Sequence, residues 1–117
     1  SEAAQPERFY HGFVLGLLVE LRDRYQLKSN RESGFGRYDV MIIPQDKSSV
    51  AMVLEFKVHE PDEEKTLEET VASSLAQIEE KKYDAELINA GVKKENIRHY
   101  GFAFEGKKVL IGTDEQR

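Results

Sequence analysis

The first part of the chain shows the hydrophobic period of a helix. Between Pro6 and Arg24 the apolar residues recur at spacings of three and four, which predicts an amphipathic helix that begins near the proline. Gly12 and Gly16 lie four residues apart and share one face of this helix, so we expect that face to pack closely against a sheet. The apolar positions of the predicted helix are Tyr10, Phe13, Val14, Leu17, Leu18 and Leu21.

Three strands are predicted to follow this helix. They cover Tyr25–Ser29, Tyr38–Ile43 and Val50–Val58, where β-branched and apolar residues are bounded by turn residues. Residues 30–37, NRESGFGR, are predicted to form a loop, because asparagine, serine and glycine favour turns. The third strand reads VAMVLEFKV and is almost continuously apolar, so we expect it to lie in the centre of the sheet with both faces covered.

Helical signals return in the second half of the chain. Thr66 and Glu69 have the spacing of a capping box, which predicts a helix that runs from residue 67 towards residue 83. A second helical piece is predicted for residues 84–90. Gly91 follows it at the position of a C-terminal cap.

The last predicted elements are a pair of strands within residues 97–111, separated by EGKK. The order of helix, three strands, helix, and one or two strands predicts an α/β fold in which a mixed central sheet is flanked by helices. A chain of 117 residues is long enough for one domain and too short for two, so we expect a single domain over residues 1–117. Because the chain starts abruptly at a helix, we expect this domain to be cut from a longer chain.

Composition excludes several classes of function. Cysteine is absent, which excludes disulfides, thiol catalysis, iron–sulfur clusters and the usual structural zinc sites. Neither GxxxxGK[ST] nor GxGxxG occurs, so the chain itself is not expected to bind ATP or a dinucleotide. The longest apolar run, FVLGLLV, is far shorter than a membrane span, and the polar start SEAAQPER lacks the apolar segment of a secretory leader. We therefore expect a cytoplasmic protein without a membrane partner.

The negative charge of the chain is concentrated in one segment. Residues 60–69, EPDEEKTLEE, hold six acidic residues and one basic residue. The charge of this segment is therefore −5, which equals the net charge of the whole chain. The remaining 107 residues balance at 16 acidic and 16 basic, so an anionic substrate is not excluded. We expect the acidic segment to form a solvated loop and helix start; the alternative is a contact surface for a protein partner.

The third predicted strand carries charges inside an apolar run. The period of two places Glu55 and Lys57 on the same face, and antiparallel pairing of the second and third strands would bring Asp39 beside Glu55. Two neighbouring carboxylates repel each other, and a divalent cation commonly stabilises such a pair. A nearby lysine then orients water or stabilises charge on a phosphate. This combination favours phosphodiester hydrolysis; the alternative is an ordinary salt bridge between Glu55 and Lys57.

The run Asp39 … Glu55-Phe56-Lys57 resembles the signature of the PD-(D/E)XK nuclease superfamily. The stretches ERFYHGFVLGLL, SNRESGFGRYDVMI, LEFKV and QIEEKKY are similar to a small bacterial branch found at the C-terminus of ATPase-like proteins. The resemblance covers about residues 6–111 and implies a restriction-endonuclease-like core of a helix, a three-strand meander, a helix and a further strand. Tyr38 stands where the name motif has its proline, a departure that many members share.

The resemblance assigns the metal site by position. It implies that Asp39 and Glu55 bind Mg²⁺ or Mn²⁺ together with the main-chain carbonyl of Phe56, and that Lys57 is the catalytic lysine. Glu7, in the first turn of the first helix, matches the glutamate that supplements the metal site in resolvase-like members. The alternative for Glu7 is a favourable charge near a helix N-terminus.

The resemblance also implies that the helix predicted from residue 67 towards residue 83 contributes side chains to the site. Gln77, with Lys81 and Tyr83, resembles the Gln…Tyr motif of the RecB-like branch, where the glutamine lies near the catalytic site; the alternative is a solvated helix face. We expect Lys81 and Tyr83 to contact nucleic acid together with Arg31 and Arg37 of the glycine-containing loop. That loop is alternatively a flexible connector whose arginines pair with nearby acidic residues.

The function expected from these residues is that of a Mg²⁺-dependent DNA endonuclease, similar to Holliday junction resolvases, in which activated water attacks the phosphodiester. The resemblance implies products with a 5′-phosphate and a 3′-hydroxyl. It also implies a homodimer, because resolvase-like relatives act as pairs, and an ATPase-like module in the parent chain. The alternative is a catalytically silent nucleic-acid-binding or regulatory module of an ATPase-like protein.

Overall fold

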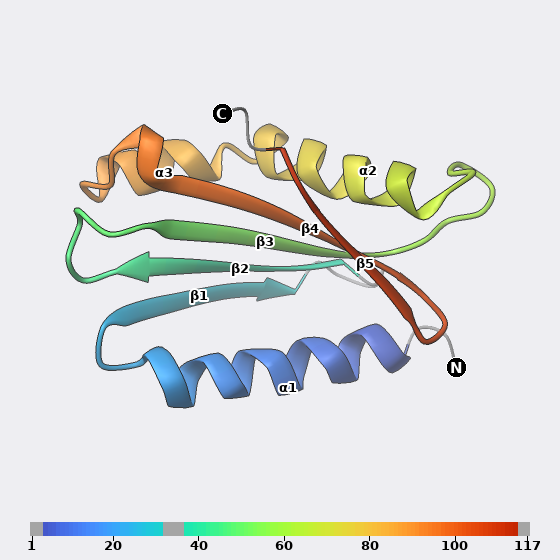
Figure 1. The fold of residues 1–117 in the computed structure, drawn as a ribbon, viewed down its shortest axis with the longest axis horizontal. Helices are drawn as coiled ribbons and strands as arrows, with labels where there is room; N and C mark the ends of the chain where they lie inside the picture. The colour runs from blue at the N-terminus through green and yellow to red at the C-terminus, as the bar shows by residue number, and fades with distance from the viewer. Residues whose placement is uncertain (1–3, 32–36, 115–117) are drawn as a thin grey trace.

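The computed structural model describes residues 4–31 and 37–114, in which five strands form one mixed sheet with helices on both faces (Figure 1). The elements are α1 (Ala4–Leu21), β1 (Tyr25–Arg31), β2 (Arg37–Pro44), β3 (Ala51–Val58), α2 (Leu67–Glu80), α3 (Tyr83–Asn89), the short 3₁₀ helix η1 (Lys94–Asn96), β4 (Ile97–Glu105) and β5 (Lys108–Thr113). The strands lie in the order β1-β2-β3-β4-β5. Neighbouring strands are antiparallel, except that β3 and β4 run parallel.

The observed order of elements confirms the expected α/β arrangement, which is compatible with a restriction-endonuclease-like core. The predicted loop at residues 30–37 is shorter than expected, because β1 continues through Arg31 and β2 begins at Arg37. Residues 32–36 of that loop lie outside the described residues. The central position expected for the third strand is confirmed, since β3 is the middle strand and is buried along most of its length.

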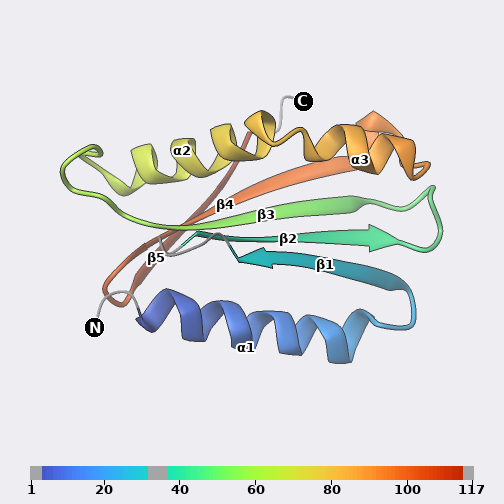
Figure 2. The same cartoon turned by 180° about the vertical axis from the view of Figure 1, so that it is seen from behind.

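Two apolar layers cover the sheet, one beneath α1 and one beneath α2 and α3 (Figures 1 and 2). Because side chains alternate along a strand, Val40 of β2 belongs to the α1 layer and Met41 to the opposite layer. The same alternation on β3 places Phe56 in the α1 layer. It places the odd-numbered charged residues of β2 and β3 on the face covered by α2.

The helix α1 packs differently from the sequence expectation. Phe13, Val14, Leu17 and Leu21 contact the α1 layer, but Leu18, expected in the same stripe, is 43% exposed. Gly12 and Gly16, the pair expected against the sheet, are exposed, and a Cβ added at either would meet nothing within 4 Å in the described chain. That expectation is wrong, because the large side chains of the helix face the sheet instead. The structure contains no described helix that is long and apolar enough to span a membrane.

A glycine of β4 allows a helix to approach the sheet closely. A Cβ at Gly101 would lie 3.0 Å from the carbonyl oxygen of Val71 and 3.1 Å from Cβ of Ser74, both in α2. The same helix begins at the predicted cap, where the backbone N–H of Glu69 donates to Oγ1 of Thr66 over 3.2 Å. The close approach brings α2 directly over the charged part of the central strands.

Candidate metal centre

Asp39 and Glu55 lie directly opposite each other on the adjacent antiparallel strands β2 and β3. Both side chains are buried, with exposed fractions of 2% for Asp39 and 0% for Glu55. The prediction that these two residues are neighbours is thereby confirmed. Like charges directly opposite in a sheet are destabilising, so this arrangement calls for nearby positive charge.

The carboxylate of Glu55 has room for a further ligand. Neither of its oxygens has a hydrogen-bond partner within residues 4–31 and 37–114. Oε2 lies 3.6 Å from Nη1 of Arg37, which is an ion pair too long for a hydrogen bond. Burial and the charge of Asp39 raise the pKa of Glu55 to about 8, although Arg37 opposes the shift. A cation against these oxygens would stabilise the charged form of the carboxylate.

Asp39 is held from the junction of α2 and α3. The hydroxyl of Tyr83 donates to Oδ2 of Asp39 over 2.6 Å, and Nζ of Lys81 lies 3.3 Å from the same oxygen. Between these two residues Lys82 adopts a left-handed conformation (φ 58°), which separates the two helices. Lys81 and Tyr83, expected to contact nucleic acid, are therefore brought into the carboxylate site itself.

These residues fit a divalent cation of the hard, oxygen-binding kind. Two carboxylates converge from neighbouring strands, and one of them presents two buried oxygens without a hydrogen-bond donor in the described chain. Mg²⁺ and Mn²⁺ prefer carboxylate, carbonyl and water ligands. Phe56, whose carbonyl was expected to complete the site, lies between Glu55 and Lys57 with its side chain in the α1 layer. Its part in metal binding stays a prediction.

Lys57 lies on the same face of β3 but makes no ion pair with Glu55 in the described residues. Its buried Nζ donates to Oε2 of Glu64 over 2.8 Å and to Oε1 of Glu60 over 3.0 Å. The alternative of an ordinary Glu55–Lys57 salt bridge is therefore wrong. The candidate catalytic lysine is held at the end of β3 by the chain segment that follows it.

Glu64 corrects the expectation that the acidic segment is solvated. Its side chain is 7% exposed, and it accepts hydrogen bonds from Oγ1 of Thr70 over 2.8 Å and from the backbone N–H of Glu60 over 2.9 Å. Burial raises the pKa of Glu64, but hydrogen bonds from Lys57, Glu60 and Thr70 lower it more, so the net shift is downward. Six acidic residues in one short run gave no signal that one of them would be buried.

For the remaining predicted site residues, the structure gives the element on which each lies. Gln77 lies on α2, partly buried and one turn before Lys81, and its role near the site stays a prediction. Glu7 belongs to α1 and Arg31 ends β1, but their side chains lie outside the described part of the chain. Arg37, expected to bind phosphate, is found against Glu55. Arg37 lies two residues before Asp39 on β2, and this spacing was the available signal, because it places both side chains on one face.

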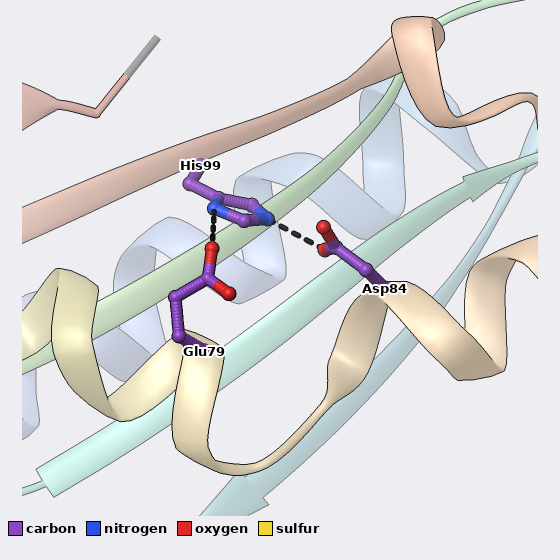
Figure 3. A group of neighbouring side chains, drawn as sticks. All are labelled: Glu79, Asp84 and His99. Atoms are coloured by element: carbon purple, nitrogen blue, oxygen red, sulfur yellow. Dashed lines mark hydrogen bonds and ion pairs between the residues drawn. The ribbon is translucent and has the colours of Figure 1, made fainter.

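A second polar cluster surrounds His99 of β4 (Figure 3). Its Nε2 lies 2.6 Å from Asp84 of α3, its Nδ1 lies 2.9 Å from Asp114, and Glu79 of α2 is 3.8 Å away. Although ligand atoms of Glu79, Asp84 and His99 lie within 4.8 Å of one another, both ring nitrogens already face carboxylates. Burial lowers the pKa of His99, but the two aspartates outweigh it, so the net shift is upward. We interpret the cluster as a histidine held between acidic groups that favour its charged form, a contact that local sequence spacing did not reveal.

The carboxylate pair, the neighbouring lysine and the topology agree with the comparison to known families. A family model of the PD-(D/E)XK nuclease superfamily matches residues 5–114. No match was found among curated proteins or among solved structures. The matched range contains every residue of the carboxylate site described above. The chain therefore belongs to the PD-(D/E)XK nuclease superfamily.

Proposed function

We propose that this chain is a Mg²⁺- or Mn²⁺-dependent DNA endonuclease of the resolvase-like kind. Its superfamily is one of nucleases, whose members typically use divalent metals. The observation that carries the proposal is the buried pair of Asp39 and Glu55, in which the Glu55 oxygens have no hydrogen-bond donor in the described residues. A buried carboxylate without donors or a cation is costly, so this pair is suited to hold a metal ion.

Each side chain has a distinct part in this proposal. Asp39 and Glu55, with the carbonyl of Phe56 and with Glu7, would hold the ion, which when bound supplies an acidified water and positive charge for the phosphate. The Tyr83 hydroxyl keeps the Asp39 carboxylate oriented through its 2.6 Å hydrogen bond.

The basic side chains have parts of their own. Lys57 would offer its ammonium to the attacked phosphate or to the water, and the Glu64 carboxylate holds that ammonium in place over 2.8 Å. Lys81, at the end of α2, adds positive charge beside Asp39. Arg31 would bind the nucleic-acid backbone, and Gln77 of α2 would line the site.

Calorimetric titration with Mg²⁺ and Mn²⁺ tests the metal site. Asp39→Asn removes one charged ligand, and Asp23→Asn removes an exposed carboxylate just after α1 as the matched control. We expect the parent and the control variant to bind metal and Asp39→Asn to bind none. Cleavage of linear, flapped and four-way-junction DNA, assayed in the same buffers, should follow the same pattern. Metal binding or cleavage that persists in Asp39→Asn contradicts the proposal.

A second candidate function is favoured by one observation. The candidate catalytic Lys57 is bonded to Glu60 and Glu64 and makes no ion pair with Glu55 in the described residues. A domain whose lysine stays in this position would bind nucleic acid without cutting it, as a regulatory module of an ATPase-like protein. DNA binding that strengthens with Mg²⁺ while every substrate remains intact would favour this second function.

The assembly is proposed from the resemblance and from the single carboxylate pair of the described chain. One chain carries one such carboxylate pair in its described part, and cutting both strands of a duplex requires two, so we propose a homodimer on DNA. Sedimentation of the 13.4 kDa chain with and without a four-way junction would measure this. An ATPase-like module in a longer parent chain and a cytoplasmic location are further proposals, to be checked on the natural full-length protein.

A further inference from the structure

Each carboxylate of the candidate metal centre lies beside a basic side chain of its own. Nζ of Lys81 is 3.3 Å from Oδ2 of Asp39, and Nη1 of Arg37 is 3.6 Å from Oε2 of Glu55. Two acidic groups are thus matched by two basic groups that belong to the chain itself. A divalent cation that binds both carboxylates has to compete with these basic groups for the same oxygens.

Arg37 is held mainly by charge. Its buried Nη1 atom has no hydrogen-bond partner in the two described segments, and Nη2 reaches Oγ of Ser73 only at 3.4 Å. A guanidinium in a lasting ion pair usually makes two short, parallel hydrogen bonds to the carboxylate. The side chain is 20% exposed and starts from the first residue of β2, so it can leave Glu55 without disturbing the apolar layers.

The surroundings of Arg37 oppose a second cation. Arg37 lies directly opposite Lys57 in the register of β2 and β3, and the Lys57 ammonium is paired with Glu60 and Glu64, so Glu55 is the acidic group that faces Arg37 in the described residues. A divalent cation at Asp39 and Glu55 would add positive charge on its other side, where burial leaves Coulomb repulsion weakly screened. Movement of the guanidinium away from Glu55 relieves this repulsion and makes its donors available. Phosphate is an anion that a guanidinium binds through two parallel hydrogen bonds.

We propose that Arg37 is the built-in counter-ion of Glu55, that a divalent cation replaces it there, and that the released guanidinium binds a phosphate of the nucleic-acid substrate. This inference rests on the proposed metal site and adds an exchange of cations to it. The exchange predicts opposite effects of Arg37 on the binding of the metal ion and on the binding of nucleic acid. Arg37 weakens the binding of the metal ion and strengthens the metal-dependent binding of nucleic acid, whereas a residue that only supports the fold would weaken both.

Titration of Mn²⁺ into the purified chain measures the exchange without any turnover. Arg37→Gln and Arg37→Met both remove the charge, and Arg22→Gln removes an exposed charge directly after α1 as the control. We expect both neutral variants at position 37 to bind Mn²⁺ at least about fivefold more tightly than the parent, the lower range of coupling between sites. The control should bind as the parent does. Equal or weaker binding by the neutral variants overturns the inference.

The second half of the exchange is read from DNA binding. Fluorescence anisotropy of a labelled duplex, with and without Ca²⁺ as an ion of equal charge, gives the metal-dependent gain in affinity. We expect this gain to be at least about fivefold smaller in Arg37→Gln than in the parent, again the lower range of coupling between sites. An equal gain in both proteins overturns the phosphate contact.

Failure of the exchange differs from failure of the metal site. If the parent binds Mn²⁺ and the neutral variants bind it no more tightly, the exchange is wrong and the metal site stands. If the parent and the variants bind no Mn²⁺, the metal site is wrong and the exchange with it. Binding by the neutral variants alone supports the exchange, because it shows that Arg37 holds the site against the ion.

Discussion

Asp39 faces Glu55 across the β2–β3 pair, so that two buried carboxyl groups share one side of the sheet beneath α2. Two like charges in this position oppose folding, and the basic groups beside them offset that repulsion only partly, because Arg37 reaches Glu55 at 3.6 Å. The stability of the fold is therefore expected to depend on a divalent cation.

Removal of the metal should lower the thermal midpoint. At a metal concentration 100 times the dissociation constant, binding to the folded state alone stabilises it by about 2.7 kcal/mol. For a domain of this size that corresponds to roughly 10 °C between Mn²⁺ and chelator. Asp39→Asn should abolish the difference, and Asp23→Asn should keep it. Differential scanning fluorimetry measures all three, and an equal shift in Asp39→Asn would sink the assignment of the ligand.

The buried pair of Lys57 and Glu64 predicts a large loss of stability when one partner is removed. Glu64→Leu removes the 2.8 Å partner of the Lys57 ammonium and leaves it only the half-exposed Glu60 at 3.0 Å, so we expect a loss of about 3 kcal/mol in the free energy of unfolding, the lower end for a broken buried pair. Lys57→Met leaves the buried Glu64 carboxylate without a cation, with the donors of Thr70 and Glu60 remaining, and should cost a similar amount. The double variant should recover most of the loss, because two apolar side chains need no partner.

Urea unfolding of the parent, both single variants and the double variant measures this coupling. Additive losses in the double variant would show that the two side chains do not stabilise each other. The measurement also bears on catalysis. Activity lost in Lys57→Met is evidence for a catalytic lysine only under conditions where the variant is folded, so the folded fraction has to be known first.

Local patterns were sufficient to predict the elements and the core of the site. The helical period, the alternation in strands and the caps at Thr66 and Gly91 act over a few residues, and the structure confirms them. Asp39 and Glu55 were predicted as neighbours because a short connection joins their strands and an antiparallel register follows from it.

Contacts between distant segments were beyond these patterns. Tyr83 reaches Asp39 across 44 positions of sequence, whereas the family motif placed Gln77 near the site and Tyr83 was expected to contact nucleic acid. Glu64 was expected in solvent because it sits in an acidic run, yet the turn after β3 returns it to Lys57. The glycines of α1 were expected against the sheet, whereas the glycine that allows close packing is Gly101 of β4. Such choices depend on how whole layers pack.

Two glycine substitutions should change stability in opposite directions. Gly101→Ala places a Cβ 3.0 Å from the carbonyl oxygen of Val71, closer than a carbon atom normally approaches backbone, so we expect a loss of about 1 to 3 kcal/mol. Gly12→Ala adds a methyl group to an exposed helical position with nothing within 4 Å in the described chain, so we expect a gain of about 0.5 to 1 kcal/mol. Urea unfolding at one pH measures both. A stabilising Gly101→Ala would contradict the close approach of α2.

His99 should make the stability depend on pH. Its pKa is raised above the unfolded value of 6.5, because hydrogen bonds to Asp114 and Asp84 outweigh burial, and Glu79 adds a third acidic group at 3.8 Å. A raised histidine pKa contributes stability that is complete below the unfolded pKa and is lost as pH rises through the folded pKa. The contribution should therefore be complete at about pH 5.5, below the unfolded pKa, and should be lost as pH rises through the raised pKa of the folded state.

His99→Gln tests this dependence, with the exposed His11→Gln as its control. We expect the free energy of unfolding of the variant to be about 1.5 to 3 kcal/mol lower than that of the parent at pH 5.5, the range of hydrogen bonds to charged groups. The difference in free energy of unfolding should shrink as pH rises through the raised pKa of the folded state, because a neutral imidazole gains little from the carboxylates of Asp84 and Asp114. Urea unfolding across this range decides the matter: a gap that is the same at every pH would mean that His99 stabilises the fold through packing and not through its charge.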